Sequence, residues 1–353
     1  MRTELRTPVR TAAPASGSAL RRQNRALVLR SLLREVTASR ADLARFTGLA
    51  RPTISEVVRG LLDEGVIIES DKRHEARPGK PATMLAFDPD AAQILAVDVS
   101  DPQRITGALV RTDGTIAHRV IGSGSAEPVT AAAHLADELL ALTPRAPLGV
   151  GIGAPMDAWT EEDRGLTARI ADAVGLAARM PAQVHPDADL AAQAERRFAL
   201  DADAADFLLV RVGQCTATTV VAEDAARSSA ARELAHVRIS ADPGPDCVCG
   251  LSGCVHGWVA AAIGSGPADP VRAVAARHLG IALSVIVTAL DLPRVVLSGP
   301  VDAGFCAAVG EAMADATRTA HLSSPTVVRP SSVENAVLRG AAARVFATEL
   351  GIA

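Results

Sequence analysis

One imidazole and three thiols gather in a short stretch of this chain. They belong to His236, Cys247, Cys249 and Cys254. Mixed nitrogen and sulfur donors of this kind are the ligands that zinc prefers, and four of them leave no obvious open position. Gly250 and Gly253 allow the loop to turn tightly enough for its sulfurs to point at one ion. The spacing therefore predicts a structural Zn²⁺ site.

The composition limits the classes of protein that these residues can serve. The chain has 353 residues, of which 48% are hydrophobic, so it is long enough for two or three domains with a large core. Aromatic residues make up only 2%, which disfavours binding by base stacking. The five cysteines do not form a disulfide framework and are typical of a reducing cytosol.

Targeting signals are not evident in the sequence. Residues 1–20 contain arginines but no apolar core of a signal peptide. The longest apolar run, Ile281 to Leu290, is too short to span a bilayer. We therefore expect a cytoplasmic protein without a membrane partner.

Charge is distributed unevenly along the chain. The net charge is −4, but residues 1–83 hold 16 basic and 9 acidic side chains, which gives this part a charge of +7. A basic head on an acidic body indicates a polyanionic partner, although an arginine-rich solvated surface has the same composition.

Three helices are expected near the N-terminus, after a tail over residues 1–18 that we expect to be disordered. The first covers roughly 20–35. The second begins with the capping box of Ser39 and Asp42 and ends at Gly48. The third carries a buried face from Ile54 to Leu62 and ends near Gly65. Ala50 stands where a Ser or Thr cap is usual.

A basic hairpin is expected after these helices, with strands near 66–69 and 83–87. Helix, helix–turn–helix and hairpin together are typical of a winged DNA-binding unit, which we place at 19–88; a small helical cap with a polar face is the alternative. Seven side chains are predicted to contact double-stranded DNA: Arg51, Thr53, Ser55 and Arg59 on the third helix, and Lys72, Arg73 and Lys80 on the hairpin.

Strands and helices alternate from residue 89 to residue 353. Strands are expected near 94–99, 107–111, 148–154, 207–212, 217–222 and 295–299, and helices near 129–142 and 268–290. This order predicts an α/β domain of two lobes. The glycines between Gly149 and Gly153 are interpreted as a device for close packing of a strand rather than as a nucleotide loop.

The chain resembles the ROK family, which joins bacterial sugar kinases to sugar-responsive repressors. The resemblance rests on the N-terminal unit, the cysteine cluster and five short motifs in the family's order, at 95–98, 149–155, 187–189, 233–236 and 296–299. It implies an actin-like, ribonuclease-H-type fold with a sugar cleft, zinc on His236 and the three cysteines, and a homodimer or homotetramer.

Both loops that hold ATP phosphates in the family's kinases are altered here. The first reads Asp98-Val99-Ser100-Asp101-Pro102-Gln103, so its glycines are lost, a proline removes an N–H group and an aspartate adds repulsion. The second reads Gly213-Gln214-Cys215-Thr216-Ala217-Thr218. Asp187 matches the kinases' general base, but a base without a positioned phosphate donor does no chemistry. We therefore expect no enzymatic activity and no catalytic residue.

The sugar site is also altered. Pro186 stands where the family has Asn, and His256 stands where it has Glu. The ligand-binding candidates are Asp187, Glu233, His236 and His256. These side chains are either a functional cleft for a sugar or sugar phosphate or remnants of one, and the sequence leaves both readings open.

The sequence thus predicts a transcription regulator, most simply a repressor, with a sensor and oligomerisation domain over 89–353. Two alternatives remain. One is a sugar kinase that kept a regulatory head. The other is a regulator whose body no longer senses a ligand and instead serves for dimerisation or partner docking.

Overall fold

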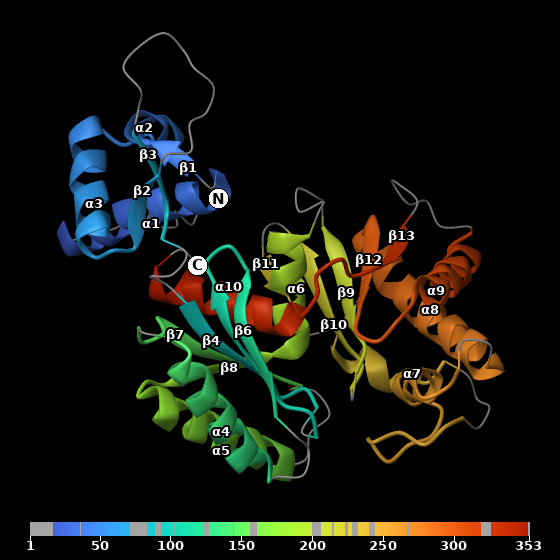
Figure 1. The fold of residues 1–353 in the computed structure, drawn as a ribbon. Coiled ribbons are helices and arrows are strands. Elements are labelled where there is room, and N and C mark those ends of the chain that lie inside the picture. The colour runs from blue at the N-terminus through green and yellow to red at the C-terminus, as the bar shows by residue number, and fades with distance from the viewer. Residues whose placement is uncertain are drawn as a thin grey trace, which may run out of the picture. The chain divides into compact units, whose positions relative to one another are not determined.

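The computed structural model divides into two compact units, residues 1–88 with the last four residues, and residues 89–349. It describes residues 17–35, 37–70, 83–88, 93–101, 103–122, 127–143, 145–155, 161–199, 206–213, 215–222, 225–227, 232–239, 244–266, 269–318 and 326–351. Figure 1 shows the elements, and each unit is described by itself below.

The first unit contains three helices and a small antiparallel sheet. In chain order these are α1 (Gly17–Glu35), β1 (Thr37–Ser39), α2 (Arg40–Thr47), α3 (Arg51–Asp63), β2 (Ile67–Ser70) and β3 (Met84–Phe87). The strand order is β1-β3-β2. Leu29, Leu43, Ile54 and Leu61 are fully buried, so the three helices share one core.

Local signals place α2 and α3 where the sequence predicts them. The capping box is confirmed, because the Ser39 hydroxyl accepts a hydrogen bond from the Asp42 amide and the Asp42 carboxylate accepts one from the Ser39 amide. Gly48 and Gly65 both have a φ of +69°, the left-handed conformation that ends a helix. Ala50 provides no side-chain cap to α3 within the part of the chain that the structure describes.

The second unit contains two five-stranded sheets that share one pattern. The first sheet has the order β6-β5-β4-β7-β8 and the second β11-β10-β9-β12-β13. In each, an antiparallel meander is extended by two parallel strands. The strands of the first sheet are β4 (Gln93–Asp98), β5 (Thr106–Arg111), β6 (Ile116–Ile121), β7 (Gly149–Ala154) and β8 (Ala182–Pro186). Those of the second are β9 (Phe207–Arg211), β10 (Ala217–Ala222), β11 (Ala225–Arg227), β12 (Arg294–Ser298) and β13 (Val327–Pro330).

Helices cover these sheets. The first lobe is covered by α4 (Pro128–Ala141) and α5 (Glu161–Ala178), and the second by α7 (Val255–Ile263), α8 (Pro270–Leu290) and α9 (Ala303–Ala316). The short helix η1 (Arg232–His236) precedes the cysteine loop. Two further helices, α6 (Asp187–Phe198) and α10 (Ala336–Glu349), pack against each other between the sheets (Figure 1).

Glycines on β7 allow α10 to lie directly on the first sheet. A Cβ atom at Gly149 or Gly151 would come within 2.9 Å of Val345, and one at Gly153 within 2.2 Å of Val337. The sequence correctly predicts close packing here, but the neighbour that requires it is a helix rather than another strand.

The helix α8 is longer than the apolar run that stands out in the sequence. It has 21 residues, and its length and composition alone would permit a membrane span, in contrast to the shorter run Ile281–Leu290. One face, including Leu279, Leu283 and Val287, is buried in the core of the second lobe. A core helix of a water-exposed domain has the same composition.

Candidate metal centre and neighbouring cleft

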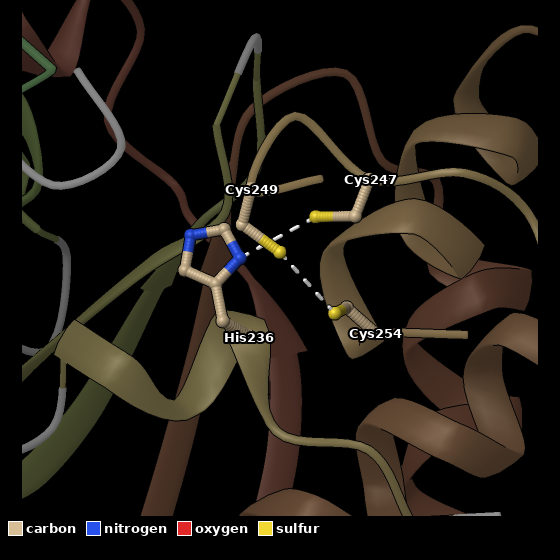
Figure 2. A group of neighbouring side chains, drawn as sticks. All are labelled: His236, Cys247, Cys249 and Cys254. Atoms are coloured by element: carbon tan, nitrogen blue, oxygen red, sulfur yellow. Dashed lines mark hydrogen bonds between the residues drawn. The ribbon is translucent and has the colours of Figure 1, made fainter. Parts of the chain in front are cut away.

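The imidazole and the three thiols lie together. Their ligand atoms are all within 4.8 Å of one another, as Figure 2 shows. The Cys247 Sγ lies 3.4 Å from the His236 Nδ1, and the Cys249 Sγ lies 3.6 Å from the Cys254 Sγ. A tetrahedral ion with bonds of about 2.3 Å to sulfur and 2.0 Å to nitrogen has edges of about 3.5–3.8 Å. The cluster is therefore able to hold a metal ion.

Backbone hydrogen bonds in the loop position these ligands. The Cys247 amide donates to the Leu251 carbonyl at 2.8 Å, and the Gly250 amide donates to the Cys247 carbonyl at 2.9 Å. Gly250 and Gly253 have φ values of +84° and +77°, so the tight turn requires residues without a Cβ. Cys254 is the N-cap residue of α7, whose Val255 amide donates to the Val237 carbonyl beside His236.

Two of the three metal-free thiols hold their protons more tightly than a free cysteine does. Burial raises the pKa of Cys254 to about 12, and burial also raises the pKa of Cys247. The pKa of Cys249, the exposed thiol, is lowered by a hydrogen bond from the Leu251 amide. Metal binding at this centre must therefore release protons.

His256 lies beside the cluster but is held by other partners. It is buried, and its Nδ1 accepts a hydrogen bond from the Thr216 amide at 3.2 Å. Its ring centroid is 6.2 Å from that of His236. Burial lowers the pKa of His256, and the nearby His236 lowers it further, so the imidazole favours its neutral form.

A second group of polar side chains surrounds Asp187 at the start of α6. Asp187 is buried, and its carboxylate lies 3.5 Å from the Arg211 Nε at the end of β9. Burial raises the pKa of Asp187 to about 6, Arg211 opposes this shift, and Asp98 adds to it. Asp98 in turn accepts a hydrogen bond from the Ser100 amide at 2.9 Å.

A polar cavity of 320 Å³ opens beside Arg211. Asp98, Ser298 and Gly299 line it together with residues 330–337 before and within α10. A Cβ at Gly299 would lie 1.9 Å from the Val212 carbonyl oxygen, so β9 and β12 approach closely at the cavity edge. The sequence reasoning missed Arg211 and this cavity. The sequence indicates Arg211 only as a charged residue at the end of the otherwise apolar strand β9.

The structure places the predicted ligand-binding residues in two groups. His236 and His256 belong to the surroundings of the metal centre, whereas Asp187 belongs to the cleft beside Arg211. Glu233 lies in η1, but its side chain is outside the described residues.

The predicted DNA-contacting residues of α3 lie at the surface. Arg51, Ser55 and Arg59 are exposed, and Thr53 is half-buried. The hairpin residues Lys72, Arg73 and Lys80 lie outside the described residues, as do Pro102 and Gln214 of the altered phosphate loops.

The comparisons with known proteins confirm the resemblance to the ROK family. The ROK family model matches residues 158–264, which include the metal centre. The chain is 23% identical to the xylose repressor of Bacillus subtilis (strain 168) over 252 residues. The match covers 67% of this chain and 65% of that repressor, so the aligned part spans about two thirds of each protein.

Solved structures give the same fold. A ROK family transcriptional regulator, described as a homolog of the Escherichia coli MLC protein, superposes with a TM-score of 0.72 at 17% identity, covering 94% of this chain and 98% of that one. A ROK hexokinase from Thermus thermophilus reaches a TM-score of 0.54 at 21% identity and covers 72% of this chain and 98% of its own. The superposition on the regulator thus includes residues of both units, whereas the superposition on the hexokinase covers a smaller share of this chain.

Proposed function

We propose that this protein is a cytoplasmic transcription regulator, most simply a repressor, that binds double-stranded DNA through its first unit as a winged helix–turn–helix. The observation that carries the proposal is the exposed basic start of α3 in a compact helical unit, joined in one chain to a ROK-type body. Similarity to xylose repressors over two thirds of the chain supports it.

The start of α3 is suited to phosphate and base contacts. Its first turn has no side-chain cap within the described part of the chain, so its unpaired N–H groups and the positive end of the helix dipole are available to an anion. Arg51 is exposed at the first position of α3, and Ser55 and Arg59 are exposed one and two turns further along the helix. The buried face of Ile54, Val58 and Leu61 keeps the opposite side fixed on the core.

Removal of the Arg51 side chain should weaken DNA binding. We expect Arg51→Ala to raise the Kd for DNA from the protein's own upstream region by about tenfold to a hundredfold. If Arg51 contacts a phosphate, the slope of log K against log salt should fall by about one unit. Fluorescence anisotropy titrations at several salt concentrations measure both quantities.

The matched control is Arg104→Ala, which removes the same charge from an exposed turn of the body. It should leave the affinity unchanged. The proposal fails if the unaltered protein binds its upstream region no more tightly than random duplex. The same titration with xylose, other pentoses, hexoses and their phosphates tests sensing, because an inducer should lower the affinity for DNA.

Sensing requires an equilibrium that a ligand can shift. The two sheets of the body are joined by α6 and α10, and the polar cavity lies between the ends of strands β4, β9 and β12 and the start of α10. A sugar that binds one arrangement of the lobes more tightly shifts the population by its difference in affinity. In a dimer or tetramer, that shift would change the spacing of the DNA-binding units.

A sugar kinase is the second candidate, and one observation favours it. The raised pKa of Asp187, about 6, suits a general base. Against it, Asp101 adds a negative charge to the first phosphate loop, and Arg211 lies 3.5 Å from the Asp187 carboxylate. Sugar-dependent ATP turnover that Asp187→Asn abolishes would establish the kinase and overturn our proposal of a non-enzyme.

We infer that the metal at the His–Cys₃ centre is zinc in a structural role. His236, Cys247, Cys249 and Cys254 would hold it, because two donor–donor distances, 3.4 and 3.6 Å, are close to the edges of a tetrahedral site and the donors are the set that zinc prefers. Zinc would fix η1 to the start of α7 and so stiffen this wall of the second lobe.

Loss of one thiol should release the metal. We expect about one zinc per chain in the purified protein and less than about a tenth of that in Cys249→Ser, with a lower melting temperature. Elemental analysis and thermal unfolding measure these effects. Cys306→Ala is the control, since Cys306 is buried in the core of the same lobe and lies outside the cluster. A full zinc content in Cys249→Ser would contradict the assignment.

A further inference from the structure

The three thiols of the metal centre differ in their access to water. Cys249 is exposed, whereas Cys247 and Cys254 are only 7% and 0% exposed. The tip of the loop around Cys249 is also open to solvent, since Val248 and Leu251 are 65% and 55% exposed. A small oxidant dissolved in water therefore reaches one sulfur of the cluster directly and is kept from the other two.

A second sulfur lies close to the exposed one. The Cys254 Sγ is 3.6 Å from the Cys249 Sγ (Figure 2), so a shift of about 1.6 Å brings the two atoms to the length of a disulfide bond. Gly250 and Gly253 lie between the two cysteines, with φ values of +84° and +77°. Because glycine adopts many backbone conformations, the loop between the cysteines is able to follow such a shift.

We propose that Cys249 and Cys254 form a site of reversible oxidation by hydrogen peroxide, and that their disulfide releases the metal. The Cys249 thiolate attacks one peroxide oxygen and breaks the O–O bond, which gives a sulfenic acid on Cys249 and one hydroxide ion. The Cys254 thiolate then attacks the Cys249 sulfur, and a second hydroxide ion leaves as the disulfide forms. The two thiolates lose two electrons, and peroxide is reduced to two hydroxide ions.

This reaction removes two of the four metal ligands. A bound zinc ion keeps its cysteine ligands deprotonated, but a disulfide sulfur is no longer a thiolate and is a poor ligand. His236 and Cys247 alone do not complete a tetrahedral site. A reducing cytosol converts the disulfide back to thiols, so the crosslink is transient and suits a sensor of oxidants.

The start of α7 connects this reaction to the rest of the second lobe. Cys254 is the N-cap of α7, and the next residue, Val255, donates its amide hydrogen to the Val237 carbonyl at 3.1 Å. One residue further, the His256 Nδ1 accepts a hydrogen bond from the Thr216 amide at 3.2 Å. A shift of Cys254 towards Cys249 strains both contacts, so we expect the oxidised protein to have a lower melting temperature.

Peroxide titration of the zinc-loaded, full-length protein tests the proposal. We expect about one equivalent of peroxide to release about one zinc ion per chain, measured with a chromogenic chelator. After alkylation of the remaining thiols, peptide mapping by mass spectrometry should find a disulfide between Cys249 and Cys254. Dithiothreitol and added zinc should restore the metal content and the melting temperature.

A variant that keeps a metal ligand but removes the exposed thiol gives the matched comparison. Cys249→His retains a nitrogen donor for zinc, so it should hold the metal and release it at least about tenfold more slowly under peroxide. Cys215→Ala and Cys306→Ala are the controls, since both thiols lie outside the cluster. These two variants should release zinc at the rate of the unaltered protein.

The proposal is wrong if peroxide releases zinc from the unaltered protein no faster than from Cys249→His, or if the mapped disulfide joins other cysteines. Irreversible oxidation of Cys249 with Cys254 still reduced also overturns it. If Cys249→His does not hold zinc, or if the purified protein contains none, the disulfide map of the unaltered protein decides alone. None of these measurements depends on DNA binding, so their failure leaves the proposed regulator function standing.

Discussion

Gly340→Ala is expected to lower the free energy of unfolding of the body by about 3 kcal/mol or more, because it forces two central helices apart. Gly340 lies on α10 where it crosses α6. A Cβ there would lie 1.8 Å from the Leu190 carbonyl oxygen and 2.4 Å from the Leu190 carbonyl carbon. Both atoms belong to helix backbone, so no side-chain rotation relieves the clash.

The separation should also disturb the cleft. Asp187 lies in the first turn of α6, and residues 330–337 at the start of α10 line the polar cavity. Moving α10 away from α6 therefore changes the position of the cavity lining relative to Asp187. We expect a loss of sugar response in this variant even under conditions where it remains folded.

Urea denaturation followed by circular dichroism measures the change in stability, with the transition of the body fitted separately from that of the first unit. Gly165→Ala is the control, because Gly165 is an exposed position of α5 with nothing within 4 Å of its added Cβ. That variant should be unchanged or more stable by up to about 1 kcal/mol through helix propensity. A Gly340→Ala protein within about 0.5 kcal/mol of the unaltered protein would show that the helices do not pack this closely.

Local patterns in the sequence were sufficient to predict the cluster of metal ligands and the ends of the helix α2 in the first unit. Three thiols within eight residues must come close in any tight loop, and the Ser39 capping box and Gly48 mark the ends of α2 by short-range hydrogen bonds. The same local reasoning identified most strands of the body, because apolar runs such as Leu95–Val97 fit a doubly covered sheet.

Long-range pairings could not be predicted in this way. Arg211 reaches Asp187 only because β9 ends where α6 begins, and the parallel pairing of β9 with β12 joins residues such as Leu208 and Val295, which are 295 − 208 = 87 positions apart. Gly340 lies in an alanine-rich helix whose sequence does not indicate which neighbour approaches it. Segments from four parts of the chain form the cavity beside Arg211, so no single sequence motif predicts it.

Asp187→Asn is expected to stabilise the body by about 3 kcal/mol at pH 8 and by progressively less as the pH falls towards 4. Burial raises the pKa of this carboxyl from 3.8 to about 6, against the opposing effect of Arg211. The folded protein thus holds the proton more tightly than the unfolded chain does. That contribution to stability is fully present below about pH 4 and is lost as the pH rises through 6.

Asparagine resembles the protonated carboxyl at every pH. It keeps an oxygen for the Ala188 amide, which donates to the Asp187 Oδ1 at 2.8 Å, and it avoids burying a negative charge. The attraction between Arg211 and the ionised carboxylate is absent both in the variant and in the protein with Asp187 protonated. The pKa of about 6 already includes this attraction, so it needs no separate correction. The variant should therefore remove the pH dependence that Asp187 confers.

Urea unfolding at pH 5 and pH 8 tests this sign, with Asp172→Asn as the control. Asp172 is an exposed carboxylate of α5, and its replacement should change the stability by less than about 0.5 kcal/mol. If Asp187→Asn instead destabilises the protein at pH 8, the ion pair with Arg211 outweighs the cost of burial. Asp187 would then be ionised in the folded protein and would hold Arg211 in place through their ion pair.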